Sequence, residues 1–522
     1  MAAFPEAPGG TSSSVLTMQP TRRLLDAAAQ ANLFESGRPV HVARAPGRLD
    51  VMGGIADYSG AVVCELPLAV AAATAVQLRY DDQVVCRSAQ AQREVRLPVE
   101  RLLDPDPLAV RRACDDADGW ARYPLGCVWW LLQQQARTQD RAIGQLRHGV
   151  TLAIDSDVPL GGGVASSAAI EVASMTAMLS VLGATLTPMD LAAGCQAVEN
   201  HVVGAPCGIM DQATAVLGQA DALFVLLCQP DESGRPARVI DTALPVPTGY
   251  TFVGVHSGVT HDVKGDSYVD TRVAAFIAQK LLSQLDPDED HTRGYLANVD
   301  PERFISTWRA ELPETMLGEV FLKRHGATND TVTAVSPEKM YHVRAAATHH
   351  VLEAERGRQF IDLVRRCGGE QPTYDQAVTS RHVNAASPGI VGLLKQWLSG
   401  ATSAATSSAS EQPCDTETLM TRAGELMYAS HASYGEYARL GHSMTDRLVE
   451  MARAIGPAGG VYGARITGAG DGGTAVMLVR ETDDVLAKID ELRQQYTRET
   501  NQPTSLFRGS GPGAVATGTA RV

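Results

Sequence analysis

Residues 159–168 read Pro159-Leu160-Gly161-Gly162-Gly163-Val164-Ala165-Ser166-Ser167-Ala168, and this stretch decides how the rest of the 522-residue sequence is interpreted. It follows the strand-like run GVTLAIDSD and precedes the apolar run SSAAIEVASMTAMLSVL, which ends at Gly183. The pattern predicts a strand, a glycine-rich turn and a helix over 166–182. Glycines let backbone amides face a ligand, and a helix N-terminus favours an anion. A phosphate-binding loop is one interpretation, and an ordinary turn with a serine N-cap is the other.

Two further glycine-rich segments lie far from the first in the sequence. Residues 45–58 read APGRLDVMGGIADY, in which Arg48 and Asp57 could serve a phosphate and a hydroxyl. Residues 468–473 read GAGDGG, which formally matches the dinucleotide-binding fingerprint. That fingerprint must open a helix, whereas the strand-like TAVMLV follows here. A solvated turn and a glycine hairpin are the respective structural alternatives.

Together and in this order, the three segments are similar to the three motifs of the GHMP small-molecule kinases. Residues 199–212 (ENHVVGAPCGIMDQ) resemble the segment that carries the catalytic aspartate of galactokinases, and residues 256–272 (HSGVTHDVKGDSYVDTR) resemble their sugar-contacting stretch. Within this sugar-kinase branch, the segments DVMGGIADYSG, VENHVVGAPCGIMDQ and GSGPGA most resemble the kinase region of plant-type L-arabinokinases. The resemblance runs from about residue 40 to the end, apart from an insertion at 401–415.

The alternating strands and helices predict an α+β protein, and the resemblance implies the two-domain GHMP kinase fold with its active site between the domains. We expect a disordered tail over 1–20, an N-terminal domain over 21–248 with the ATP loop and catalytic aspartate, and a C-terminal domain over 249–522. The low-complexity insertion 401–415 falls in the second domain. We also expect a helix over 21–33, a long helical stretch through 425–454, and then a glycine-rich strand–turn–strand.

The resemblance implies a role for each site residue. Asp211 would act on the anomeric hydroxyl of a sugar, either as a base or by orienting it, and Arg48 would neutralise charge on the transferring phosphoryl group. Ser167 and Glu199 would hold Mg²⁺ with hard oxygen atoms. ATP would lie beside Trp120 and against the loop residues Gly161, Gly162, Gly163, Val164, Ala165, Ser166, Ser167 and Ala168. The sugar would contact Asp57, Tyr268, Gly54, Ile55 and Gly470.

The expected sugar is inferred from one difference between this sequence and the galactokinase motif. Galactokinases read Gly-Glu-His-x-Asp-Tyr, and their Glu and His contact the exocyclic C6 hydroxyl of the sugar. This chain has Gly53-Gly54-Ile55-Ala56-Asp57-Tyr58. A hydroxyl buried there without a partner would cost roughly 1–3 kcal/mol. L-arabinose has the ring stereochemistry of D-galactose without the C6 group, so we expect an ATP-dependent sugar 1-kinase that prefers L-arabinose. A galactokinase, a kinase of another sugar, or a catalytically silent sugar and ATP sensor are the alternatives. Asp471 departs from the small residue expected in the last motif, and its role is open.

Composition excludes several other classes. The formal net charge is −14, from 45 basic and 59 acidic residues, so we expect no nucleic-acid partner. The longest apolar runs are interrupted before the roughly 18–20 residues of a membrane span, so we expect no membrane partner. Nothing implies a protein partner. The predicted location is cytoplasmic, and a loose peroxisomal pattern at Arg23-Leu24 and Gln30-Ala31 is the weak alternative.

Overall fold

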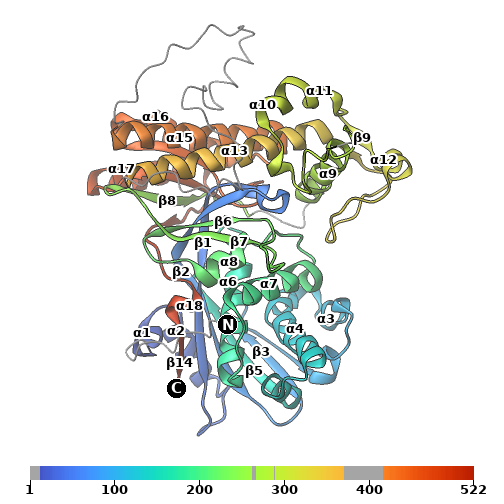
Figure 1. Ribbon diagram of the computed structural model, residues 1–522. Coiled ribbons are helices and arrows are strands. Elements are labelled where there is room, and N and C mark those ends of the chain that lie inside the picture. The colour runs from blue at the N-terminus through green and yellow to red at the C-terminus, as the bar shows by residue number, and fades with distance from the viewer. Residues whose placement is uncertain (1–11, 261–265, 287–288, 369–414) are drawn as a thin grey trace.

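The computed structural model describes residues 12–260, 266–286, 289–368 and 415–522. Two main β-sheets with their covering helices, together with a small two-stranded sheet, make up the described part of the chain (Figure 1). The described residues are thus mixed α and β, as the sequence predicts. The insertion predicted at 401–415 lies outside the described residues except for Asp415, whose side chain accepts a hydrogen bond from the Thr418 amide at the start of a helix.

The larger sheet is predominantly antiparallel, and all of its strands except β14 come from the first half of the chain. Its strand order is β14-β1-β2-β5-β3-β4, with β6 paired to β2 and β7 to β6. Only the pair β3 and β5 among these is parallel. The strands are β1 (His41–Met52), β2 (Val62–Leu78), β3 (Gln83–Ser88), β4 (Arg93–Pro98), β5 (Gly149–Ser156), β6 (Ala222–Leu227), β7 (Arg238–Pro245) and β14 (Thr519–Arg521).

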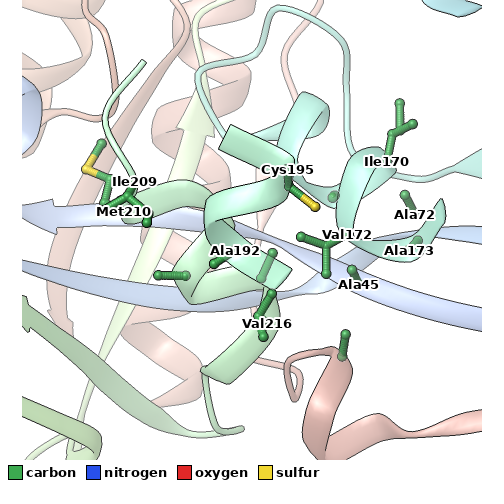
Figure 2. Close-up of a cluster of buried hydrophobic side chains, with 14 of the residues drawn as sticks. Ala45, Ala72, Ile170, Val172, Ala173, Ala192, Cys195, Ile209, Met210 and Val216 are labelled. Atoms are coloured by element: carbon green, nitrogen blue, oxygen red, sulfur yellow. The ribbon is translucent and has the colours of Figure 1, made fainter. Parts of the chain in front are cut away.

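Helices cover one face of this sheet, and α6 (Ser166–Leu182) lies at their centre. It has the predicted bounds and ends at Gly183 in the left-handed conformation. It packs on β1 and β2 because small and β-branched side chains face Ala45 and Ala72, with α7 and α8 beside it (Figure 2). The helices of this unit are α3 (Pro107–Ala113), α4 (Arg122–Thr138), α5 (Arg141–Gly144), α7 (Pro188–Ala197) and α8 (Met210–Leu217).

The smaller sheet is antiparallel and has the order β11-β12-β8-β13. Its strands are β8 (Tyr250–His256), β11 (Val461–Ile466), β12 (Thr474–Arg480) and β13 (Leu506–Phe507). The predicted strand–turn–strand is β11 and β12. Helices α13 (Val343–Cys367), α15 (Thr416–Ser433), α16 (Ser443–Ile455) and α17 (Asp483–Thr500) cover it (Figure 1). Beside them lie α9 (Asp266–Leu282), α10 (Pro301–Arg303), α11 (Arg309–Glu311), α12 (Gly318–His325), β9 (Met316–Leu317) and β10 (Met340–Tyr341).

The structure differs from the sequence predictions for the helical stretch 425–454 and for the tail 1–20. The stretch 425–454 is not one continuous helix, because α15 passes into a π-helical turn, η8 (Tyr434–Ala438), and Arg439 then has a φ of 61°. A new helix, α16, starts after His442, whose ring accepts the amide of Met444. The predicted disordered tail is also too long. Residues 12–17 form α1 (Ser12–Thr17), in which Val15 is fully buried, and residues 1–11 lie outside the described residues.

The N-terminal helix α2 (Thr21–Gln30) packs on the larger sheet as an amphipathic helix. Arg23 pairs with Asp155 at 2.5 Å and with Asp157 at 2.8 Å, and Leu24 is only 2% exposed. The arginine and leucine of the loose peroxisomal pattern are therefore engaged within the fold. Within 12–260, 266–286, 289–368 and 415–522, we find no helix with the length and apolar character of a membrane span.

Candidate active site

The three glycine-rich segments meet at one place. Arg48, from the first segment, donates from Nη1 to the carbonyl oxygen of Gly163 at 2.7 Å. Thr474, directly after the last segment, donates from Oγ1 to the carbonyl oxygen of Gly162 at 2.7 Å. A Cβ atom on Gly468 would lie 2.9 Å from the Gly163 carbonyl oxygen. Segments separated by hundreds of residues therefore hold the loop 159–165 between them.

The approach of β1 to this loop depends on one glycine. The register between β1 and β2 shifts between Pro46 and Arg48, so β1 is irregular at Gly47. A Cβ atom on Gly47 would lie 2.6 Å from the carbonyl oxygen of Val164, which is shorter than any ordinary contact. The Arg48 amide then donates to that same oxygen at 3.1 Å. The bulge and the missing side chain bring Arg48 against the loop.

The start of α6 differs from the expected serine cap. Its N-cap residue is Ala165, in the left-handed conformation at φ 59°, and no side chain accepts a hydrogen bond there. Ser166 and Ser167 are instead the first two helical residues. A left-handed alanine is strained relative to glycine. The first amides of α6 thus have no side-chain cap, which leaves the positive end of the helix available to an anion.

A cavity of about 280 Å³ opens at this helix start, between elements of both halves of the chain. Its lining includes many of the predicted site residues, which come from β1, the 3₁₀ turn after it, the loop, the start of α6, the π-helical turn after α7, α8 and α9. They are Arg48, Ile55, Asp57, Gly161, Gly163, Ala165, Ser166, Ser167, Glu199, Asp211 and Tyr268. The other lining residues, which were not predicted from the sequence, are Tyr123, Cys207, Gly208, Met210 and Ala469.

The remaining predicted residues lie around this cavity without lining it, within the described part of the chain. Gly162, Val164 and Ala168 belong to the loop and the first turn of α6, and Gly54 and Gly470 are the chain neighbours of the lining residues Ile55 and Ala469. Trp120 and Tyr123 both pack against the hydrophobic core, and of these two aromatic residues only Tyr123 also lines the cavity. Asp471 is exposed, and its amide donates to Leu440 at 2.6 Å.

Arg48 contacts two acidic side chains of the site, Asp211 and Glu65. Its Nε and Nη2 lie 2.9 and 2.7 Å from the same oxygen of Asp211, and its Nε lies 3.3 Å from Glu65. The arginine is 4% exposed and Glu65 is fully buried. Burial, together with the charge of Asp50, raises the pKa of Glu65 well above its ordinary value, although Arg48 acts in the opposite direction. A buried cation held by two carboxyl groups has a fixed orientation toward the loop.

Glu199 lies in a π-helical turn, η5 (Val198–Val203), and faces the start of α6. Gln212 donates to its Oε2 at 2.6 Å, and Ser167 also hydrogen-bonds to this carboxylate. Burial raises the pKa of Glu199 to about 7, and the Ser167 hydrogen bond opposes this shift. No cluster of three or more His, Cys, Asp and Glu ligands occurs in the described residues. A hydroxyl and a carboxylate in contact fit a cation that keeps several waters and binds phosphates, as Mg²⁺ does.

Asp57 and Tyr268 also line the cavity. Asp57 belongs to the 3₁₀ turn η1 (Gly54–Ser59), and burial raises its pKa to about 7, with the charge of Asp211 adding to the effect. A Cβ atom on Gly208 would lie 1.7 Å from Asp57 Oδ2, so only glycine lets this carboxylate fit. The Tyr268 ring lies edge-on to Tyr58 at 6.2 Å.

Two buried acids near the site were missed by the sequence analysis. Glu65 stands within the apolar run VVCELPLAV, and Glu171 within AAIEVASM, one helical turn after Ser167. Gln212 lies 3.4 Å from Glu171 as well as contacting Glu199, so Glu171 supports the same cluster. An acidic residue inside an apolar segment was the available signal, because such residues are seldom fully buried without a partner or a function.

Both the sequence and the structure of this chain are similar to those of known kinases. The model of the GHMP kinases N terminal domain matches residues 123–219, and that of the GHMP kinases C terminal domain matches residues 417–498. An L-arabinokinase of Arabidopsis thaliana is 31% identical over 95% of this chain, which spans about half (48%) of that protein's length. A galactokinase of Chloroflexus aggregans is 27% identical over 91% of this chain and 94% of its own. The crystal structure of Lactococcus lactis galactokinase complexed with galactose has the same fold, with a TM-score of 0.62 at 20% identity, covering 94% of this chain and 99% of that one.

Proposed function

The chain belongs to the GHMP kinases, whose N-terminal and C-terminal domains it carries, and from that premise we propose that it is an ATP-dependent sugar 1-kinase with L-arabinose as its preferred acceptor. The observation that carries the proposal is the position of Arg48. It joins the carboxylate of Asp211 to the carbonyl of Gly163, beside a cavity that a helix N-terminus also faces. A sugar hydroxyl beside Asp211 and the phosphates of ATP beside the loop could therefore approach each other next to Arg48.

Phosphoryl transfer depends mainly on positioning and on charge stabilisation. In the proposed reaction the anomeric oxygen attacks the γ-phosphorus of ATP, and the bond from that phosphorus to the oxygen of the leaving ADP breaks. We assign the released proton to Asp211, whose Oδ1 is already engaged by Arg48. Arg48, as a fixed cation, would stabilise negative charge on the phosphoryl oxygens.

The ATP phosphates would lie against the loop 161–168 and the uncapped amides of α6. Ser167 and Glu199 would hold Mg²⁺ at this end of the cavity. When bound, the cation would neutralise part of the charge on the phosphates. The two residues are already in contact, so little rearrangement of this chain would be required.

The sugar would occupy the part of the cavity lined by Asp57, Tyr268 and Ile55. Asp57 and Tyr268 offer polar atoms to ring hydroxyls, whereas Ile55 is apolar and only 2% exposed. An exocyclic hydroxyl against Ile55 would lose its water partners at a cost of roughly 1–3 kcal/mol. A pentose avoids this cost. D-galactose is the second candidate, because the galactokinase of Chloroflexus aggregans matches over nearly its whole length.

The test is ADP release with L-arabinose, D-galactose and D-galacturonate, with the phosphorylated carbon identified by ³¹P and ¹³C NMR. We expect the highest kcat/KM with L-arabinose and the phosphate on C1. A higher kcat/KM with D-galactose would make the chain a galactokinase. ADP release at background with every sugar, together with retained sugar and ATP binding, would make it a sensor.

The remaining proposals concern organisation and location. We propose a division near residue 249, since β7 belongs to the larger sheet and β8 to the smaller one. We propose a cytoplasmic location, supported by the engagement of Arg23 and Leu24 within the fold. Sugar and ATP are the proposed binding partners.

A further inference from the structure

Tyr434 is a fully buried residue that ties two of the three glycine-rich segments together. Its hydroxyl accepts a hydrogen bond from the Ile55 amide at 2.9 Å and donates one to the Gly468 carbonyl at 2.9 Å. The residue opens the π-helical turn η8, which interrupts the helical stretch from α15. Such turns often occur where a side chain must be redirected for function.

Gly54 makes room for this tyrosine. A Cβ atom on Gly54 would lie 1.9 Å from the Tyr434 hydroxyl and 2.8 Å from the ring carbon that carries it. Gly54 also has a φ of 48°, in the left-handed region that favours glycine. A rigid ring bonded at both sides of its hydroxyl cannot move aside cheaply. Any side chain at position 54 therefore competes with Tyr434 for the same space.

The aromatic ring of Tyr434 is also closely surrounded. A Cβ atom on Gly470 would lie 3.1 Å from Tyr434 Cδ1, and the guanidinium of Arg465 lies 5.3 Å from the ring centre. Tyr434 belongs to one hydrophobic cluster with Ile55 and Tyr268, both of which line the cavity. The tyrosine thus forms the layer directly behind the Ile55 wall.

We propose that Tyr434 is the positioning residue that sets the depth of the sugar pocket at its Ile55 wall, and that it selects acceptors without an exocyclic hydroxymethyl group. The inference rests on the proposed function and names the residue that acts behind Gly54 and Ile55. Its hydroxyl fixes the backbone of Ile55, and its ring fills the volume that a side chain at position 54 would occupy. In this proposal the preference for the acceptor depends on two features together, the missing side chain at position 54 and the tyrosine that fills its space.

This changes how the substrate preference can be engineered. Replacing Gly54 by glutamate and Ile55 by histidine, with no other change, would force the longer side chain at position 54 into Tyr434. The double variant G54E/I55H should therefore lose kcat/KM for both sugars. Adding Tyr434→Leu removes the ring and its hydroxyl from the space beside position 54, and it should raise the ratio of kcat/KM for D-galactose over L-arabinose at least tenfold above the wild-type ratio, which corresponds to about 1.4 kcal/mol.

Two single variants test Tyr434 directly. Tyr434→Leu, which shortens the side chain, should raise the same ratio several-fold. Tyr434→Phe keeps the ring and removes both hydrogen bonds of the hydroxyl. It should raise the KM for L-arabinose about tenfold, with kcat within threefold of wild type and little change in the sugar ratio. The control is Tyr462→Leu, because Tyr462 is another buried tyrosine of this half of the chain and does not line the cavity.

The outcomes separate the two proposals. A wild-type protein that phosphorylates no sugar overturns the proposed function and, with it, the role of Tyr434. An active wild type together with an unchanged sugar ratio in folded Tyr434→Leu overturns only the present inference. If circular dichroism finds Tyr434→Leu unfolded, Tyr434→Phe decides, since an unchanged KM for L-arabinose then rejects the positioning role.

Discussion

Arg48 and Asp211 are joined through a single carboxylate oxygen, with Nε at 2.9 Å and Nη2 at 2.7 Å from Oδ1. Neither bond involves Oδ2, and Asp211 lines the cavity. The arginine therefore holds the carboxylate through one oxygen, and its guanidinium leaves the other oxygen, Oδ2, unengaged. In the proposed reaction, Arg48 would hold Oδ1 while Oδ2 would act on the sugar hydroxyl, and the first prediction tests this role of Asp211.

Asp211→Asn should lower kcat by about 10²–10⁴-fold, because the amide cannot take a proton from the sugar hydroxyl. The amide has nearly the same shape as the carboxylate, so the affinities for ATP and L-arabinose should change by less than about threefold. Steady-state rates and calorimetric titrations measure the two effects separately. Turnover at the wild-type level would remove Asp211 from the chemistry.

The pKa of Glu199, raised to about 7, predicts a pH-dependent affinity for Mg²⁺. Below pH 7 the cation must displace a proton, so its apparent Kd should rise by up to about tenfold for each unit of pH lost, and it should level off above pH 7. Glu199→Gln should have weak affinity with little pH dependence. Equal wild-type Mg²⁺ affinity at pH 6 and pH 8 would argue against Glu199 as a ligand.

The same shift predicts a pH dependence of stability without metal. The folded protein binds more protons than the unfolded chain between the ordinary glutamate pKa of 4.5 and about 7. The free energy of unfolding should therefore fall as pH rises through this window and then level off. Thermal melts at pH 5 and pH 8 measure the change. Glu199→Gln should reduce the slope without removing it, since burial also raises the pKa of Asp57 to about 7.

Gly208→Ala should act through Asp57. The added methyl group would lie 1.7 Å from Asp57 Oδ2, so this carboxylate must leave its position. We expect the KM for L-arabinose to rise at least tenfold while the KM for ATP stays within about twofold. Gly144→Ala is the matched control, because its Cβ would meet only ordinary contacts of 3.7 Å or more. Equal effects of Gly208→Ala on both KM values would mean that the cavity as a whole is disturbed.

Tyr123 and Trp120 can be separated by a pair of leucine substitutions. Both rings pack against the core, and of the two only Tyr123 lines the cavity. Tyr123→Leu should therefore raise the KM for ATP more than Trp120→Leu does, whereas both substitutions should lower the melting temperature. A larger KM effect at Trp120 would instead support Trp120 as the residue beside the adenine.

The sequence predicted those features that depend on local patterns. The apolar run closed by Gly183 defined α6 at both ends, and three glycine-rich segments in order indicated one site. The π-helical turn at Tyr434 was missed, because its hydroxyl bonds reach Gly468 and, across 379 residues, Ile55. No periodicity in the segment 425–454 carries information about partners so distant.

The contrast between Trp120 and Tyr123 was out of reach of the sequence for a related reason. Both aromatic residues stand in the same short segment, at the end of η3 (Asp116–Ala121) and the start of α4, and both pack against the core, so no local pattern tells which of them also lines the cavity. The left-handed Ala165 was equally hidden, since alanine rarely adopts this conformation and nothing in the letters VASSA requires it.

The pairing of β14 with β1 has a consequence for biogenesis. Residues 519–521 lie against residues 41–43, and the backbones of Val40 and Val522 exchange two hydrogen bonds at 2.9 Å. The larger sheet therefore receives one edge strand only after the ribosome has synthesised nearly 500 further residues. Until then the edge of β1 is open to pairing with another chain. The nascent first half thus passes through a period in which this edge is exposed, and a polypeptide that ended at residue 248 would carry that open edge permanently.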